Sequence, residues 1–376
     1  MSLADEHKQE KQKTSRLFAL DLIRVIAMLF VVLYHFNIIL LAAGIDGTPD
    51  VFSMFGRNIA FGQVGVVLFF LLSGFVCHLS FDRKFQGGRF WKECGRFYLK
   101  RWLSIVPMFY VGFLATYFIS QMQHGIRLDQ RVIYNILTID KYVELTCGTE
   151  TVSNIGEWFT CILLFFYLVF PFFYLLKKKI GKYIFIAVIV FLRFFGVYFT
   201  EHGLGFFHAA LQYLPTFLTG MLFSEFMRNR EMPLPAAIAG LAITIVVTFV
   251  PLPSEGVKGW FLVAAIGIGL FMMLTYIGQK LDNRMSEKSP VRDAIGLMSR
   301  YSFPAYLTHR LLASYMTPVI FFSLRGIRFW VVLIVYLGIT FFLSVCLQGA
   351  TDKIIDGIRA FGKKIRSKKE SYGKQR

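Results

Sequence analysis

Long apolar runs separated by short polar stretches dominate this chain. Each run is close to the about 20 residues that a helix needs to cross roughly 30 Å of hydrocarbon. The pattern predicts an all-α fold, a polytopic membrane bundle of about ten transmembrane helices. The predicted spans are residues 17–43, 59–80, 102–121, 157–176, 180–200, 206–227, 233–251, 259–279, 296–322 and 328–350. We do not expect the first run to be a cleavable signal peptide, because it is too long and lacks a small-residue cleavage site.

Composition supports the membrane class. Hydrophobic residues make up 56% of the 376 residues, and the mean hydropathy is +0.56. A soluble domain could not bury this much apolar surface and still build a polar exterior from the remainder.

The distribution of lysine and arginine predicts the orientation. With the N-terminus inside, 31 of the 41 basic residues fall in cytoplasmic segments, seven on the opposite side and three within spans. Basic residues resist transfer across the membrane, so this asymmetry indicates an even number of spans with both termini cytoplasmic. We therefore divide the chain into a basic N-terminal tail (1–16), a membrane domain (17–350) and a basic C-terminal tail (351–376).

The net charge of +18 is explained by this topology together with attraction to the anionic headgroups of membrane lipids. Nucleic acid is not expected as a partner, because the tail from Lys353 to Arg376 has few aromatic residues and no recognition module. The five cysteines are scattered without a CxxC pair, and no histidine lies at metal-ligand spacing, so we expect neither a metal nor a disulfide. The absence of a Gly-rich phosphate loop and of G-x-S-x-G argues against an ATP-driven pump and a serine hydrolase.

Ionisable residues inside the first span are the most informative feature. Asp21, Arg24 and His35 stand in otherwise apolar sequence, where a charged side chain costs at least about 2.5 kcal/mol unless it faces a polar interior. Arg24 and His35 are eleven residues apart, so they share a helix face about 16 Å apart along the axis. Asp21 precedes Arg24 by three residues and is close enough on that face to pair with it.

Two interpretations of this face stay open. In the structural one, Asp21 and Arg24 anchor the helix end while His35 bonds a neighbouring helix. In the functional one, His35 takes a proton from a hydroxyl, and Arg24 meets an anionic ligand that enters from the cytosol.

Five segments in order then resemble one known family. Arg24, ten intervening residues and His35 look like the arginine-x10-histidine signature of the acyltransferase family 3 integral membrane proteins. The other four segments are FFLLSGFV (Phe69 to Val76), the basic YLKRWLSIVP (Tyr98 to Pro107), EWFTCILLFFYLVFP (Glu157 to Pro171) and SFPAYLTH (Ser302 to His309). The resemblance covers residues from about 17 to 345.

Two positions depart from the family pattern. Many members have a second arginine three residues after the one matching Arg101, where this chain has Ser104. Many also have a glutamate five residues after the tryptophan, where this chain has Leu163. Glu157, just before Trp158, is the nearest carboxylate. Whether Glu157 takes the role of the missing glutamate stays open.

The resemblance implies a bacterial O-acetyltransferase type of enzyme in the cell membrane. Such a protein moves an acetyl or other short acyl group from cytosolic acyl-CoA, its donor substrate, to a hydroxyl of a cell-envelope carbohydrate or its lipid-linked precursor. No bound cofactor is implied. His35 then becomes the catalytic base, and Arg24 and Arg101 bind or position the donor. The residues expected to line the site are Asp21, Glu157, Trp158, Ser302, Tyr306 and His309.

Two other classes of function fit parts of this sequence. A transporter of polysaccharide or lipid-linked sugar also suits many spans with buried charges, but it should show repeats or broken helices at matching places in two halves. Pro107, Pro171, Pro215 and Pro304 are not placed in that way. A sensor or scaffold without chemistry would leave Arg24 and His35 unexplained.

Overall fold

Helices are the only regular secondary structure in the part of the chain that the computed structural model describes. The described residues are 3–49, 61–85, 89–124, 130–139, 143, 157–201, 205–228, 230–249, 257–286, 288–320 and 322–373. The elements are α1 (Leu3–Ala42), α2 (Phe61–Lys84), α3 (Phe90–His124), α4 (Gln130–Ile136), α6 (Glu157–Glu201), α7 (Gly205–Phe226), α8 (Leu234–Phe249), α9 (Val257–Arg284), α10 (Pro290–Arg300), α11 (Ser302–Met316), a short 3-10 turn (Thr317–Val319) and α12 (Ile327–Gly373). The all-α prediction is confirmed for these residues.

Five of the described helices are long and apolar enough to cross a membrane. Their apolar segments are Phe18–Ala42 in α1, Phe61–Arg83 in α2, Trp158–Tyr198 in α6, Phe261–Arg284 in α9 and Ile327–Ala360 in α12. These helices support a multi-pass membrane protein. The count of ten spans and the cytoplasmic placement of both termini remain predictions.

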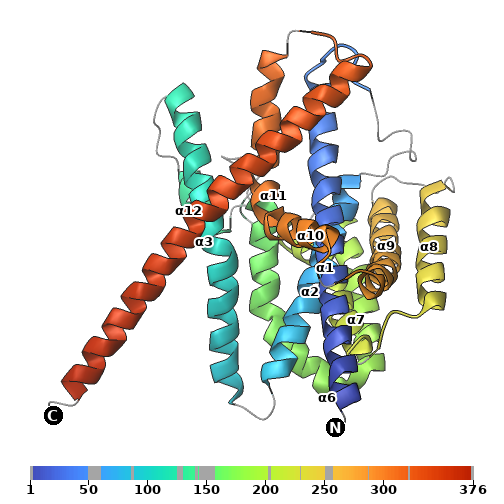
Figure 1. Ribbon diagram of the computed structural model, residues 1–376, viewed down its shortest axis with the longest axis vertical. Coiled ribbons are helices and arrows are strands. Elements are labelled where there is room, and N and C mark those ends of the chain that lie inside the picture. The colour runs from blue at the N-terminus through green and yellow to red at the C-terminus, as the bar shows by residue number, and fades with distance from the viewer. Residues whose placement is uncertain are drawn as a thin grey trace.

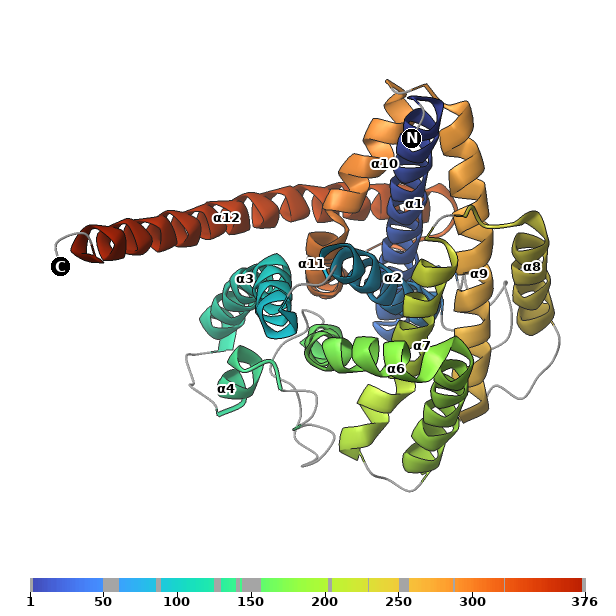
Figure 2. The ribbon, with the colours of Figure 1, turned by 90° about the horizontal axis from the view of Figure 1, so that it is seen from below.

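Helix α6 contains a sharp elbow between two predicted spans. Gly181 has φ +77° and ψ 170°, which interrupts the helical backbone at the start of the predicted span 180–200, just after the span 157–176. Glycine adopts this positive φ without the steric cost that a Cβ would add. The two halves of α6 therefore run in different directions (Figure 2).

The predicted span 296–322 is wrong in its extent. The structure divides it between α10, which ends at Arg300, and α11, which begins at Ser302. Pro304 has no N–H to donate to the carbonyl of Arg300, and its ring would clash with that carbonyl, so a continuous helix is disfavoured here. As a result α10 lies across the bundle while α11 runs roughly parallel to α1 (Figure 1).

The centre of the bundle is built from helices that approach very closely. Helix α2 packs against α1, α7 and α9, and α1 also packs against α9, α10 and α11. A Cβ at Gly74 of α2 would lie 1.8 Å from the carbonyl oxygen of Phe217, and one at Gly220 of α7 would lie 2.0 Å from that of Leu71. Small residues allow such approach where lipid gives no hydrophobic drive for helix association.

Helix α12 closes one side of the bundle and then leaves it. It contacts α11 and α3, and its C-terminal part extends beyond the other helices (Figure 1). The helices α1 and α12 also continue into the segments predicted as the basic tails, from Leu3 and to Gly373.

Candidate functional site

Two histidines from helices α1 and α11 lie against each other. The rings of His35 and His309 have centroids 5.0 Å apart in an edge-to-face arrangement. His35 Nδ1 lies 2.9 Å from the Val31 carbonyl oxygen, and His309 Nδ1 lies 2.6 Å from that of Tyr306. A carbonyl only accepts, so in the neutral rings Nδ1 carries the proton and Nε2 the lone pair. His35 Nε2 is therefore the nitrogen suited to take a proton.

His309 is held in place by α12 and by aromatic neighbours. Its side chain is buried, and its Nε2 has no hydrogen-bond partner among the described residues. The Tyr336 hydroxyl donates to the His309 carbonyl at 3.0 Å, and the Tyr336 ring stacks on Phe36 of α1 at 4.5 Å. On the other side, the Tyr306 ring lies 5.6 Å from the His309 ring. The α1–α11 contact that brings the two histidines together is thus fixed from both sides.

Arg24 occupies a polar cluster about 16 Å along α1 from His35, because eleven helical steps of roughly 1.5 Å separate the two residues. Its Nη1 donates to Asp21 Oδ1 at 2.8 Å and to Ser299 Oγ at 2.7 Å. The Ser299 hydroxyl in turn donates to Asp21 Oδ1 at 2.6 Å. Asp21 and Arg24 are each about one third exposed, whereas Ser299 of α10 is buried. The guanidinium is therefore oriented by two partners and still has donors left for a ligand.

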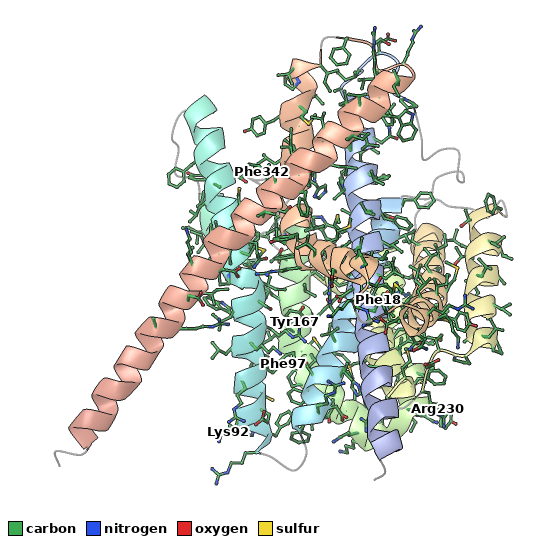
Figure 3. The ribbon with its side chains drawn as sticks, in the orientation of Figure 1. Phe18, Lys92, Phe97, Tyr167, Arg230 and Phe342 are labelled. Carbon is green, nitrogen blue, oxygen red and sulfur yellow. The ribbon has the colours of Figure 1, made fainter. Side chains whose placement is uncertain are left out.

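Arg101 approaches the same region from α3. Its guanidinium lies 5.2 Å from the centroid of the Tyr167 ring and 5.5 Å from that of Phe97. These two rings meet edge to face between α3 and α6 (Figure 3). Its Nη2 also donates to Ser80 Oγ of α2 at 3.3 Å. No carboxylate of the described residues forms an ion pair with Arg101. Its charge is thus held by aromatic faces and is available to an anion.

Arg24 and Arg101 line one cavity of about 360 Å³. Ser302 and Tyr306 of α11 also line it, so four of the residues predicted for the site meet in this space. The remaining lining residues come from α2, α3, α6, α10 and α11: Phe69, Leu72, Ser73, Val76, Ser104, Ile105, Phe159, Leu163, Tyr167, Ser299, Arg300 and Phe303. Both positions that depart from the family pattern, Ser104 and Leu163, are among them. Three cations therefore line the cavity together with aromatic side chains, and one of them, Arg300, forms an ion pair with Asp352 of α12 at 3.2 Å.

The other predicted site residues take different places. Asp21 binds Arg24, while His35 and His309 lie beyond Tyr306 and do not line the cavity. Trp158 packs on Tyr213 at 5.9 Å and is not part of the lining. Glu157 begins α6, and its side chain lies outside the described part of the structure.

Sequence reasoning missed several contributors to this cavity. Ser299 binds both Asp21 and Arg24 from 275 or more residues away in the chain, and no spacing rule points to it. Tyr167 beneath Arg101 belongs to the segment that carries the family resemblance, but an aromatic residue in an aromatic-rich helix gives no distinct signal.

The helical bundle and its cavity define a membrane protein with an arginine pair beside a histidine pair. Comparison with family models matches residues 17–349 to the acyltransferase domain. Neither the curated proteins nor the solved structures give a match. The chain belongs to acyltransferase family 3. It is therefore a membrane acyltransferase, and the transporter alternative is not favoured.

Proposed function

We propose that this protein transfers an acetyl or other short acyl group from cytosolic acyl-CoA to a hydroxyl of a cell-envelope carbohydrate or of its lipid-linked precursor. The observation that carries the proposal is the shared cavity of Arg24 and Arg101, whose far end is formed by Tyr306 beside the histidine pair. A donor with several phosphates fits the two cations, because charged hydrogen bonds to phosphate are among the strongest in proteins.

The donor then lies along the cavity with its thioester towards Tyr306. Arg24 and Arg101 hold phosphate oxygens, and the walls formed by Phe69, Phe159 and Tyr306 exclude water from the reactive end. Phe159 and Tyr306 are themselves in contact, with ring centroids 4.9 Å apart. Excluding water favours transfer to the acceptor over hydrolysis of the thioester.

The acceptor hydroxyl is placed at His35 Nε2. As its oxygen attacks the thioester carbonyl carbon, Nε2 takes the hydroxyl proton. The C–S bond breaks, and the departing sulfur receives that proton from the imidazolium, which gives an ester and free CoA thiol. In an acyl-enzyme route His35 Nε2 would itself attack the thioester carbon and release CoA thiolate, and the acceptor hydroxyl would then take the acyl group from the ring and give its proton to the thiolate.

The test uses purified protein with acetyl-CoA labelled in the acetyl group and a carbohydrate fraction from the envelope of its host. We expect label in the carbohydrate and an equal amount of free CoA thiol, and neither product with His35→Ala. Sugar movement across proteoliposomes without consumption of acetyl-CoA would instead identify a transporter. NMR of the polysaccharide from a deletion strain and its parent then identifies the hydroxyl that is acylated.

A further inference from the structure

A second cavity lies between α6 and the C-terminal end of α7. It has a volume of about 440 Å³ and shares no residue with the cavity of Arg24 and Arg101. We refer to it as the α6–α7 cavity. Its lining residues are Lys182, Ile186, Leu222, Glu225, Phe226, Arg228 and Arg230. Three cations and one carboxylate thus face an otherwise apolar space.

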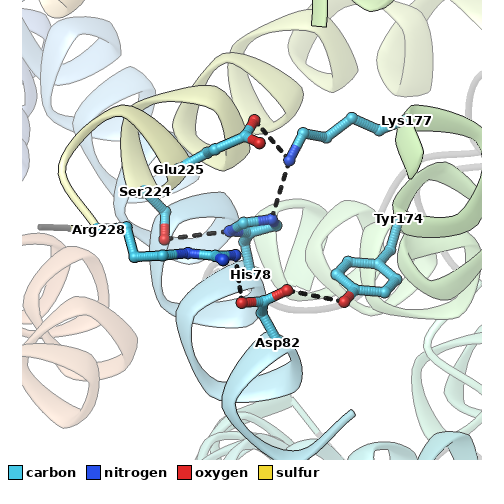
Figure 4. A network of polar contacts seen from close by, with 7 residues as sticks. All are labelled: His78, Asp82, Tyr174, Lys177, Ser224, Glu225 and Arg228. Atoms are coloured by element: carbon cyan, nitrogen blue, oxygen red, sulfur yellow. Dashed lines mark hydrogen bonds and ion pairs between the residues drawn. The ribbon is translucent and has the colours of Figure 1, made fainter. Parts of the chain in front are cut away.

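The carboxylate of this cavity, Glu225, is already paired with a buried lysine that does not line the cavity. Glu225 pairs with Lys177 at 2.6 Å, and Lys177 is buried. The Lys177 ammonium also donates to His78 Nε2 at 3.2 Å, while His78 Nδ1 donates to Ser224 at 3.3 Å. This network joins α2, α6 and α7 (Figure 4). Glu225 therefore cannot serve as the counter-ion of the exposed cations as well.

One of the three cations is also committed. Arg228 forms an ion pair with Asp82 of α2, and the Tyr174 hydroxyl donates to the other oxygen of that carboxylate at 2.8 Å (Figure 4). Lys182 and Arg230 remain. Both are exposed, and within the described residues neither forms an ion pair. The Lys182 ammonium lies over the Tyr183 ring, 4.9 Å from its centroid. The cavity therefore carries two surplus positive charges.

The apolar wall of the cavity identifies the kind of anion. Ile186 of α6 and Phe226 of α7 are 44% and 47% exposed. Leu222 of α7 completes the apolar part of the lining. A free phosphate or a nucleotide would leave this surface bare, whereas a lipid covers it with an acyl chain. The cavity also follows the elbow at Gly181, where the basic residues predicted to be cytoplasmic meet the apolar second half of α6. Basic pockets between membrane helices on the cytoplasmic side bind anionic headgroups.

We propose that the α6–α7 cavity binds an anionic glycerophospholipid. Its phosphate lies between Lys182 and Arg230, and one acyl chain follows Ile186 and Phe226. The site is separate from acyl transfer, and binding there ties the second half of α6 to the end of α7.

The test compares two charge-matched double variants of the full chain, purified in a neutral detergent. The first is Lys182→Gln with Arg230→Gln. The control is Lys179→Gln with Arg284→Gln, which removes the same charge from exposed positions outside the cavity. Native mass spectrometry with added phosphatidylglycerol or phosphatidylcholine counts bound lipid and gives apparent affinities.

We expect the unaltered protein and the control to retain phosphatidylglycerol in preference to phosphatidylcholine. The cavity variant should bind phosphatidylglycerol about thirtyfold more weakly, since two cations near the headgroup are lost. Equal binding by both variants would overturn the proposal. Displacement of the lipid by millimolar inorganic phosphate would assign the site to free phosphate, and displacement by acetyl-CoA would assign it to the donor; either result would also overturn it.

Discussion

His35 and His309 meet edge to face with their ring centroids 5.0 Å apart, and each ring commits its Nδ1 to a main-chain carbonyl one helical turn earlier. The two histidines therefore share one tautomer but differ in how far their side chains are exposed. His309 is 2% exposed, whereas His35 is only partly buried. In the proposed mechanism, His35 is therefore the base that meets the acceptor, and His309 is a residue that positions His35.

The first prediction contrasts these two residues. His35→Ala should lower kcat for acetyl transfer by about 10²- to 10⁴-fold, the usual contribution of a positioned general base. His309→Gln should lower it only severalfold, because the His309 ring is buried against His35 and positions it without meeting the acceptor. Rates are measured with equal amounts of protein that elutes as a single species in detergent. Equal losses in the two variants would show that both rings take part in proton transfer, and full activity of His35→Ala would remove His35 from the mechanism.

The second prediction concerns the two cavity arginines. Replacing Arg24 or Arg101 by Ala should weaken acyl-CoA binding about ten- to a hundredfold, since a charge-assisted hydrogen bond contributes roughly 1.5–3 kcal/mol. Lysine should restore part of the affinity, because it keeps the charge but not the paired donors of the guanidinium. Lys92→Ala is the control, because Lys92 is a cation of α3, the helix that carries Arg101, but does not line the cavity. Calorimetric titration with acetyl-CoA gives the affinities, and unchanged binding in folded Ala variants would defeat the donor site.

The sequence allowed the local part of this site to be predicted. The spacing of Asp21, Arg24 and His35 on one helix follows from 3.6 residues per turn, and the pairing of Asp21 with Arg24 is present at 2.8 Å. Ser299 could not be predicted, because its place between these side chains depends on how α10 crosses α1. That crossing depends in turn on the helix break before Pro304. Hydropathy does not predict this break, because the sequence on both sides of it belongs to one apolar run.

Arg193 shows the same limit. It lies deep in a predicted span with no motif around it, and the sequence gives no partner. In the structure its guanidinium donates to the Gln212 carbonyl at 2.7 Å and to Thr216 Oγ1 at 2.8 Å, both on α7. The contact is set by the packing of α6 on α7, which apolar periodicity does not specify.

The third prediction tests whether Ser299 positions Arg24. Ser299→Ala removes a hydroxyl that accepts from Arg24 and donates to Asp21. The KM for acetyl-CoA should rise severalfold while kcat changes little, because the guanidinium keeps its charge but loses one of two partners. Ser344→Ala is the control, since Ser344 is also buried but bonds only the Thr340 carbonyl of its own helix among the described contacts. A change in kcat alone would place Ser299 in the chemical step and not in donor positioning.

The last prediction links helix packing to the cavity. Gly74→Ala would put a methyl group 1.8 Å from the Phe217 carbonyl oxygen, and main-chain atoms on α7 cannot move aside without separating the two helices. Overpacking of this kind costs typically about 1–3 kcal/mol, so the protein should unfold at a lower temperature in detergent. Gly338→Ala in α12 is the control, because a Cβ there meets nothing within 4 Å.

Donor binding should fall together with stability in the Gly74 variant. The neighbouring Ser73 lines the cavity, and Ser80 on the same helix holds Arg101. A displaced α2 therefore moves the wall and the support of the donor site at once, which the α12 control does not do. If Gly74→Ala unfolded at the original temperature and bound acetyl-CoA normally, the close approach of α2 and α7 would have no part in shaping the cavity.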